Sequence, residues 1–432
     1  MQRVDRQLGE YRLLARLAKG GQSEVFLGAR GGPHGYFRPL VIKAMPEELK
    51  GDEKMEALFY QEAALSSRFA HPHVVTIHDA RQDGDDHFMV MDYLAGQTVA
   101  ELAQRAFSSG EGLSLDEALV IMADACRGLG YVHSFRDVEC REYSIVHCDI
   151  SPQNLMVTYD GLTRVFDFGI SQLSDGDEFE TTKTDLIGGK YSYMSPEQCR
   201  KETLDTRSDI FSLGIILYEL VARRRLFRRS SKEEVVEAIT EEPIEPPSQV
   251  ADYVDEELDE VVLKALQRDA DDRYTSAGQM AEALEEVLIA RDVDVEELRA
   301  ELGAKVEGLF CEERDEIAEM LREAREDFRK KGQGLAFEPG PSERELELEV
   351  ELEEVQQKVE KLRDNAERAT EVASALSEEV TLLQNRQNWF VAAMGVLALI
   401  AFAAAMMAYL SHGGTVFEDE ATAQAAETAS GD

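Results

Sequence analysis

The chain has 432 residues, 44% of them hydrophobic and 7% aromatic, which is enough for a sizeable packed core and too long for one ordinary domain. Its 86 acidic and 46 basic residues give a formal net charge of -40. That charge argues against nucleic acid as a partner, because phosphate backbones require Lys and Arg surfaces. The five cysteines are irregularly spaced and form no CxxC pair, so they predict reduced cytosolic thiols rather than disulfides or a zinc site.

After a short N-terminal extension, residues 1–10, brief β-like runs surround a single helical stretch, Met55–Arg68. The runs are Tyr11–Leu17, Glu24–Ala29, Leu40–Ala44, Val74–Ala80 and His87–Tyr93. Beyond Thr98 the pattern becomes mainly helical. We therefore expect a small strand-rich lobe followed by a larger helical lobe.

The first two predicted strands enclose a turn of small residues, over which backbone N–H groups can approach phosphates closely. These residues are Ala18, Gly20, Gly21 and Ser23. Taken alone, an ordinary glycine-rich hairpin is the commoner explanation. The turn gains meaning from Lys43 on a following strand and Glu62 in the predicted helix. A lysine that holds phosphates needs such a carboxylate to orient it.

Two further motifs follow in the helical half. In IVHCDISPQNL, Asp149 is placed to accept the proton of an attacking hydroxyl, and Asn154 is placed to bind Mg²⁺. In the DFG motif, Asp167 supplies a second metal ligand. The segment YMSPE then ends at Glu197, and Asp209 begins the helical run DIFSLGIILYEL. Each piece alone can arise by chance, but five in this order and spacing do not fit an accidental match.

With these motifs, residues 11–290 resemble the eukaryotic-like serine/threonine protein kinases of bacteria. The form DxSPxN and the additional stretch Ser134–Ser144 resemble the myxobacterial-type branch of that family. The resemblance implies an α+β, two-lobed protein kinase fold. It also implies ATP and Mg²⁺ as cofactors, a protein substrate, and transfer of the γ-phosphoryl group to Ser or Thr hydroxyls.

Carried over position by position, the resemblance implies that Lys43 and Glu62 form an ion pair. Asp149 is then the catalytic base, and Asn154 and Asp167 hold the metal. Residues that would bind the nucleotide are Leu17, Ala18, Gly20, Gly21, Ser23, Val25, Val41, Lys43, Met91, Asp92, Leu94 and Met156.

The resemblance also implies structural roles in the large lobe. Glu197 would pair with Arg273, and Asp209 would brace the catalytic loop. The intact Ser195-Pro-Glu197 segment and Asp209 disfavour a kinase of small molecules. In the activation segment, Thr181, Thr182 and Thr184 are candidate phosphorylation sites, although hydroxyls are common in any polar loop.

Three departures from the family pattern support an alternative from another class, a pseudokinase scaffold that binds nucleotide or partners without phosphoryl transfer. Cys148 replaces the arginine that usually precedes the catalytic aspartate, and Ser151 replaces a lysine that contacts the γ-phosphate. Lys190 replaces a threonine that usually contacts the catalytic aspartate. Because the residues expected to bind ATP, metal and proton are intact, an active kinase is the preferred interpretation.

The remaining chain is predicted to consist of helical and linker segments. Residues 291–331 are a charged helical extension with no assigned chemistry, and residues 332–342 are a Gly/Pro linker. Residues 343–388 carry apolar positions at heptad spacing, which predicts a helical stalk. These heptads favour a coiled-coil homodimer, with a single solvated helix as the alternative.

Residues 389–410 carry no charge, and their length predicts one transmembrane helix. Arg386 precedes this stretch, whereas no Lys or Arg follows it, so the positive-inside rule places the kinase domain in the cytoplasm. Residues 411–432 would then form a short acidic extracytoplasmic tail. The expected location is the inner membrane, with a single pass and the C-terminus outside.

Overall fold

The computed structural model describes residues 1–332, except 22, 111, 138, 141–142, 144 and 169–189, together with residues 395–407. The chain divides into two compact units, Met1–Glu338 and Pro339–Asp432. The first unit contains every residue of the candidate site.

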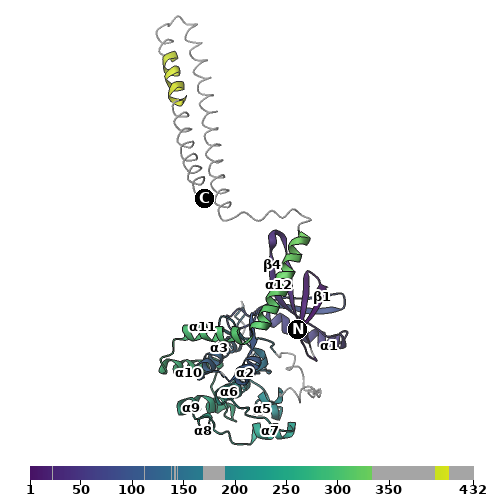
Figure 1. Ribbon diagram of the computed structural model, residues 1–432, viewed down its shortest axis with the longest axis vertical. Helices are drawn as coiled ribbons and strands as arrows, with labels where there is room; N and C mark the ends of the chain where they lie inside the picture. The colour runs from purple at the N-terminus through teal and green to yellow at the C-terminus, as the bar shows by residue number, and fades with distance from the viewer. Residues whose placement is uncertain are drawn as a thin grey trace. The chain divides into compact units, whose positions relative to one another are not determined.

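Six antiparallel strands form the first lobe, in the order β1-β2-β3-β4-β6-β5 (Figure 1). The strands are β1 Gln2–Leu8, β2 Tyr11–Lys19, β3 Glu24–Gly31, β4 Phe37–Ala44, β5 Ile77–Asp83 and β6 Asp86–Asp92. The helix α1 (Glu53–Ser66) packs against β5. It begins at Asp52, whose side chain accepts hydrogen bonds from the backbone N–H groups of Lys54 and Met55, as N-cap residues do.

Two differences from the predicted strands have physical causes. The sequence pattern does not indicate β1, because this edge strand is mostly polar and exposed and lacks an apolar alternation. The strand predicted from Val74 begins instead at Ile77, since Val74 forms an isolated parallel bridge to Val165.

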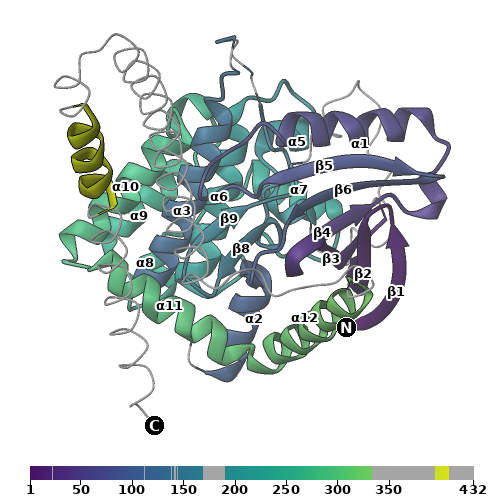
Figure 2. The same ribbon diagram turned by 90° about the horizontal axis from the view of Figure 1, so that it is seen from above.

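The second lobe is mainly helical and begins with a small sheet of β7 (Gly96–Thr98), β8 (Leu155–Thr158) and β9 (Thr163–Val165). The described helices that follow α1 along the chain are α2 Val99–Ser109, α3 Leu115–His133, α5 Pro196–Arg200, α6 Thr206–Ala222, α7 Lys232–Thr240, α8 Pro247–Val250, α9 Glu256–Ala265, α10 Ala277–Ala290, α11 Val295–Leu309 and α12 Cys311–Gly332. The helix α6 is buried over almost its whole length and packs on α3 and α9. A helix that is apolar on all sides belongs in the middle of a core, and Figure 2 shows α6 surrounded by the other helices.

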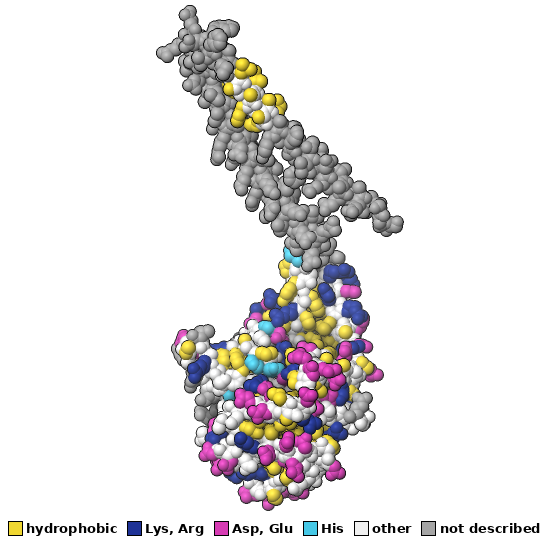
Figure 3. Space-filling model, turned by 90° about the vertical axis from the view of Figure 1, so that its left-hand side faces the viewer, with side chains coloured by type: hydrophobic (Ala, Val, Ile, Leu, Met, Phe, Trp, Pro, Cys, Tyr) yellow, Lys and Arg dark blue, Asp and Glu magenta, His cyan; other side chains and the backbone are white. Residues whose placement is uncertain are grey.

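The prediction of a strand-rich lobe followed by a larger helical lobe is confirmed, and the arrangement is that of the two-lobed protein kinase fold. On the face shown in Figure 3, acidic and basic side chains are interspersed over the surface of this unit, as expected of a solvated, charged exterior. All five cysteines are free thiols.

The C-terminal segments are predicted to contain a linker, a coiled coil and a transmembrane helix. Among the residues that the structure describes, no helix has the length and apolar character needed to cross a membrane. This finding overturns the predicted transmembrane helix at 389–410 and the inner-membrane location inferred from it. The linker and the coiled coil at 343–388 lie outside the described residues.

Candidate active site

Lys43 contacts two carboxylates, the buried Glu62 and the partly exposed Asp167. Lys43 lies on β4, and its Nζ donates a hydrogen bond of 2.8 Å to Oε1 of Glu62 on α1. The same ammonium group contacts Oδ1 of Asp167, which follows β9. Only 9% of Lys43 and 7% of Glu62 is exposed, so little solvent screens this pair.

The electrostatics of this cluster keep the lysine charged. Burial alone would lower the pKa of Lys43, but the adjacent carboxylates of Asp167 and Glu62 outweigh it and raise the pKa above its ordinary value. Burial is also the largest influence on Glu62 and raises its pKa, while Lys43 opposes that rise. Lys43 on β4 therefore remains positively charged, as phosphate binding requires.

A hydrogen-bonded loop joins Asp149 to Asn154. The Nδ2 of Asn154 donates to the backbone carbonyl of Asp149 at 2.8 Å and to its Oδ2 at 3.3 Å. Asn154 ends the short 3-10 turn Pro152–Asn154 and is 8% exposed, whereas Asp149 is only half-buried. The loop thus leaves a partly accessible carboxylate whose orientation is fixed by a buried amide.

Asp209 fixes the same loop from below. Its carboxylate accepts the backbone N–H of His147 at 2.7 Å and of Cys148 at 2.9 Å. His133, on α3, contacts the same carboxylate at 2.8 Å through Nε2. Both Cys148 and Asp167 adopt left-handed backbone angles, with φ of 63°. Such conformations cost energy in residues other than glycine, and the bonds from Asp209 hold the loop in this one.

Phe168 anchors the segment that carries Asp167. Its side chain is 2% exposed and packs edge-on against Phe69, with ring centroids 5.2 Å apart. The ring of His147 lies 4.8 Å from it, and Nε2 of His147 contacts the carbonyl of Phe166 at 3.2 Å. The catalytic loop and the Asp167 segment are therefore held against one another by packing as well as by hydrogen bonds.

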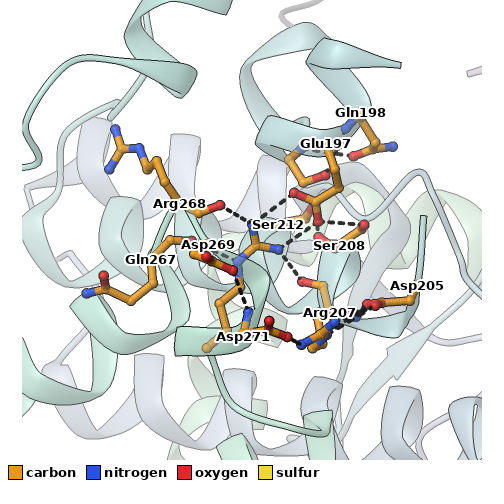
Figure 4. A network of polar contacts seen from close by, with 12 residues as sticks. Glu197, Gln198, Asp205, Arg207, Ser208, Ser212, Gln267, Arg268, Asp269 and Asp271 are labelled. Atoms are coloured by element: carbon orange, nitrogen blue, oxygen red, sulfur yellow. Dashed lines mark hydrogen bonds and ion pairs between the residues drawn. The ribbon is translucent and has the colours of Figure 1, made fainter. Parts of the chain in front are cut away.

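Glu197 and Arg273 form a buried, two-pronged ion pair in the helical lobe (Figure 4). Nη1 of Arg273 lies 2.7 Å from Oε1 of Glu197, and Nη2 lies 2.9 Å from Oε2. Ser208 also donates to Glu197, at 2.7 Å. Burial raises the pKa of Glu197, but the hydrogen bonds from Arg273 and Ser208 outweigh it and hold that pKa below its usual range.

Four of the positions predicted to bind nucleotide, Val25, Val41, Lys43 and Met91, share one face of the sheet. Opposite residues of antiparallel strands share a face, and Val25 pairs with Lys43 while Val41 pairs with Met91. The turn before Val25 is closed by a backbone bond of 2.8 Å from the N–H of Gly20 to the carbonyl of Ser23. Of the other positions, Leu17 lies at an irregularity in the pairing of β2 with β3, Ala18 and Gly21 are exposed at the turn, and Met156 lies on β8 opposite Thr98.

The hinge between the lobes has a restricted hydrogen-bonding capacity. The side chain of Asp92 accepts from Arg38 at 3.0 Å and contacts His78 at 2.7 Å, and its backbone N–H donates to the carbonyl of Thr76. An adenine ring at the hinge would therefore meet the backbone carbonyl of Asp92 and the backbone of Leu94 rather than the Asp92 side chain.

The departures from the expected pattern have definite surroundings. Cys148 and Ser151 are both buried, and the carbonyl of Cys148 accepts a bond of 2.8 Å from Nε2 of Gln198. Sequence reasoning missed this link, although the Ser195-x-x-Gln198 capping box that holds Gln198 has a recognisable spacing. Thr181, Thr182, Thr184 and the side chain of Lys190 lie outside the described residues.

Asp167 and Asn154 offer a carboxylate and an amide oxygen, the ligand types that Mg²⁺ prefers. Among the described residues, no three His, Cys, Asp or Glu side chains gather closely enough to hold a metal ion by themselves. A Mg²⁺ ion at these two residues would need phosphate oxygens and water to complete its coordination, as is usual where the ion is bound with a nucleotide. The donor set therefore fits a metal that arrives with its nucleotide.

Comparison with known proteins identifies the fold. Residues 11–288 match the family described as protein kinase domain. Tyrosine-protein kinase MasK of Myxococcus xanthus is 36% identical over 310 residues, which cover 71% of this chain and 47% of that protein. Serine/threonine-protein kinase PknB of Mycolicibacterium smegmatis is 33% identical over 275 residues, covering 62% of this chain and 41% of PknB.

The chain thus spans less than half the length of these two curated relatives. Among solved structures, the crystal structure of the Mycobacterium tuberculosis PknI kinase domain is 22% identical. It covers 65% of this chain and 96% of that domain, with a TM-score of 0.48. The match over residues 11–288 extends across most of this chain, which therefore belongs to the protein kinase family.

Proposed function

We propose that the chain transfers the γ-phosphoryl group of ATP to Ser or Thr hydroxyls of proteins, with Asp149 as the base. Protein kinases use ATP with Mg²⁺. The observation that carries the proposal is the buried 2.8 Å ion pair between Lys43 and Glu62, formed beside Asp167. A scaffold that never bound phosphate would gain nothing from burying a lysine between two carboxylates, because such burial costs solvation energy.

Each residue has a task that its surroundings suit. Lys43 would hold phosphate oxygens, with Glu62 fixing its position. Asn154 and Asp167 would hold the metal, which supplies charge neutralisation at the phosphates when it is bound. Asp149 is half-buried and oriented by Asn154, so its carboxylate can accept a proton from a hydroxyl presented at the cleft.

A second acceptor class has one observation in its favour. MasK, which is 36% identical, is named a tyrosine-protein kinase, whereas PknB at 33% is named a serine/threonine-protein kinase. The residues at the phosphate end of the cleft serve either acceptor, since both present a hydroxyl to the same base. We favour Ser and Thr because the catalytic motifs of residues 11–290, taken together, resemble those of the serine/threonine protein kinases of bacteria.

The test is phosphoamino-acid analysis of the full chain incubated with Mg²⁺, labelled ATP and a generic protein substrate. The Lys43→Met variant serves as the inactive control. Label on phosphoserine and phosphothreonine that is lost in the variant supports the proposal, and label on phosphotyrosine alone moves the assignment to the second class. Wild-type protein that binds ATP without transferring label is the pseudokinase scaffold. Mass spectrometry of the same sample shows whether Thr181, Thr182 or Thr184 becomes phosphorylated.

A further inference from the structure

Two helices beyond the family match, α11 and α12, run along one side of the kinase unit. Figure 2 shows α11 beside the helical lobe and α12 continuing from it to the strands. In the contacts between elements, α11 packs on α2, α3, β7 and β8, whereas α12 packs on β2, β3 and β4. The pair of helices therefore touches both lobes.

The attachment of α11 to the helical lobe is specific. Arg299 donates two hydrogen bonds of 2.6 Å to the carboxylate of Asp124, which is 2% exposed. Lys305 pairs with the buried Glu117 at 2.6 Å. A Cβ added at Gly303 would overlap the carbonyl oxygen of Tyr159, so the helix backbone lies directly against the turn after β8.

The attachment of α12 to the strand-rich lobe is apolar. Its inward stripe follows helical spacing and consists of Ile317, Met320, Leu321, Ala324 and Phe328. Met320 is 4% exposed and Ala324 is 3% exposed, and both pack with residues of β2 and β3. The Phe328 ring lies over Gly31 and 6.0 Å from Phe37. Arg12 and Asp327 add a polar contact of 3.0 Å at the edge of this stripe.

The surface that α12 covers continues the nucleotide-facing side of the sheet. Along β3, alternate residues share a face, so Leu27 and Ala29 lie on the same face as Val25. Leu27 also pairs with Val41, which shares that face. Leu27 and Ala29 are completely buried and belong to one apolar cluster with Met320 and Ala324 of α12.

The same cluster reaches the hinge and the roof of the cleft. Tyr93, the hinge residue after β6, and Leu17, a predicted nucleotide-binding residue, both pack against it. At the junction of the two helices, the Arg105 guanidinium lies 4.1 Å from the centroid of the Phe310 ring and donates to the carbonyl of Leu309 at 2.9 Å. Thus α12 contacts the strands β2, β3 and β4, and its apolar cluster also includes the hinge residue Tyr93 and Leu17, a predicted nucleotide contact.

We propose that residues 295–332 form an interlobe strap that sets the shape of the nucleotide cleft from the hinge side. The lobes of a two-lobed kinase can move about the hinge, and a brace fixed to both lobes limits that motion. A cleft held in its binding shape loses less conformational entropy when a nucleotide binds, so its affinity is higher. Ala324 and Met320 are positioning residues, since they act through Leu27 and Leu17. The proposal rests on the nucleotide binding assigned above.

The test compares Ala324→Asp with Ala318→Asp in the full chain. Both changes place the same charge on α12, but Ala318 is exposed and lies outside the apolar stripe. Isothermal titration with Mg²⁺ and a non-hydrolysable ATP analogue gives both Kd and the number of sites. We expect Ala324→Asp to raise Kd about tenfold and Ala318→Asp to leave it within about twofold. If Ala324→Asp only unfolded part of the protein, the titration would give fewer nucleotide-binding sites per chain and an unchanged Kd.

A second pair of variants changes the other end of the strap, at α11. It keeps the proposal testable if Ala324→Asp does not fold. Gly303→Ala would force α11 away from Tyr159, whereas a Cβ at Gly308 on the same helix meets only open space. The strap is supported if Gly303→Ala raises Kd and Gly308→Ala does not. Equal Kd values within both pairs overturn it. Wild-type protein that binds the analogue but transfers no phosphate would refute the proposed activity and leave this comparison intact.

Discussion

The substitution Arg273→Lys is expected to destabilise the protein, because it keeps the positive charge but removes the planar guanidinium group and its five N–H donors. The guanidinium of Arg273 makes five hydrogen bonds: two to the Glu197 carboxylate, at 2.7 and 2.9 Å, and three to backbone carbonyls. The carbonyls belong to Arg207 at 2.8 Å, Gln267 at 2.8 Å and Arg268 at 3.1 Å. An arginine has five N–H donors, so every one is used.

The expected loss in free energy of unfolding follows from the number of hydrogen-bond donors that the substitution removes. A lysine ammonium has three donors, so at least two of the five acceptors lose their partner. The Arg273 side chain has 0% exposure, so water cannot replace the missing donors. At ~1–3 kcal/mol for each buried group left unpaired, the expected loss in free energy of unfolding for two groups is about 2–6 kcal/mol.

Arg224→Lys is the matched control. Arg224 pairs with Glu245 at 3.2 Å, but the two side chains are 54% and 61% exposed. An exposed pair of this kind contributes ~0–1 kcal/mol, so the same substitution there should change little. The assay is urea unfolding of the full chain followed by far-ultraviolet circular dichroism. If Arg273→Lys unfolds within about 0.5 kcal/mol of Arg224→Lys, counting unpaired donors is the wrong physical basis for this site.

Three further changes test other contacts. Because the pKa of Glu197 is lowered in the folded state, the ionised carboxylate stabilises the fold above the unfolded pKa of ~4.3, and this stabilisation is lost as pH falls through the folded pKa. The difference in free energy of unfolding between wild type and Glu197→Gln, measured by urea unfolding, should therefore become smaller below pH ~4.3. A difference that stays constant with pH would contradict the lowered pKa. Asp209→Asn turns an amide N–H toward the N–H donors of His147 and Cys148, so thermal unfolding should show a loss of about 2–4 kcal/mol, whereas an unchanged melting temperature would show that the brace is dispensable. Ser151→Lys restores a cation near the transferred group and should raise kcat severalfold in a labelled-ATP assay, and an unchanged kcat would mean that another group already supplies that charge.

The local motifs made much of the site predictable. Lys43 and Glu62 lie 19 positions apart in the chain, and the strand-then-helix pattern alone places them on adjacent elements, where their atoms lie 2.8 Å apart. Asp149 and Asn154 lie within one loop, so their spacing nearly determines their contact. Short-range constraints of this kind can be read without knowledge of the tertiary fold.

The strap could not be predicted in the same way. The sequence predicts a helical extension at 291–331, but Arg299 and Asp124 are separated by 175 positions, and nothing local pairs them. The apolar stripe of α12 is also narrow, and the many acidic and basic residues around it make it difficult to recognise in the sequence. The edge strand β1 was missed for a related reason, since its pairing with β2 rather than its own pattern makes it a strand.

Phosphoryl transfer with Asp149 as the base is tested by the variant Asp149→Asn. The amide keeps the shape of the side chain and its contact with Asn154 but cannot accept the proton. In the full chain with Mg²⁺ and labelled ATP, the variant should bind the nucleotide as tightly as wild type while its transfer rate falls by about 10²–10⁴-fold. Transfer at the wild-type rate would contradict the assignment of the base, and no transfer by wild-type protein that binds ATP would contradict the kinase itself.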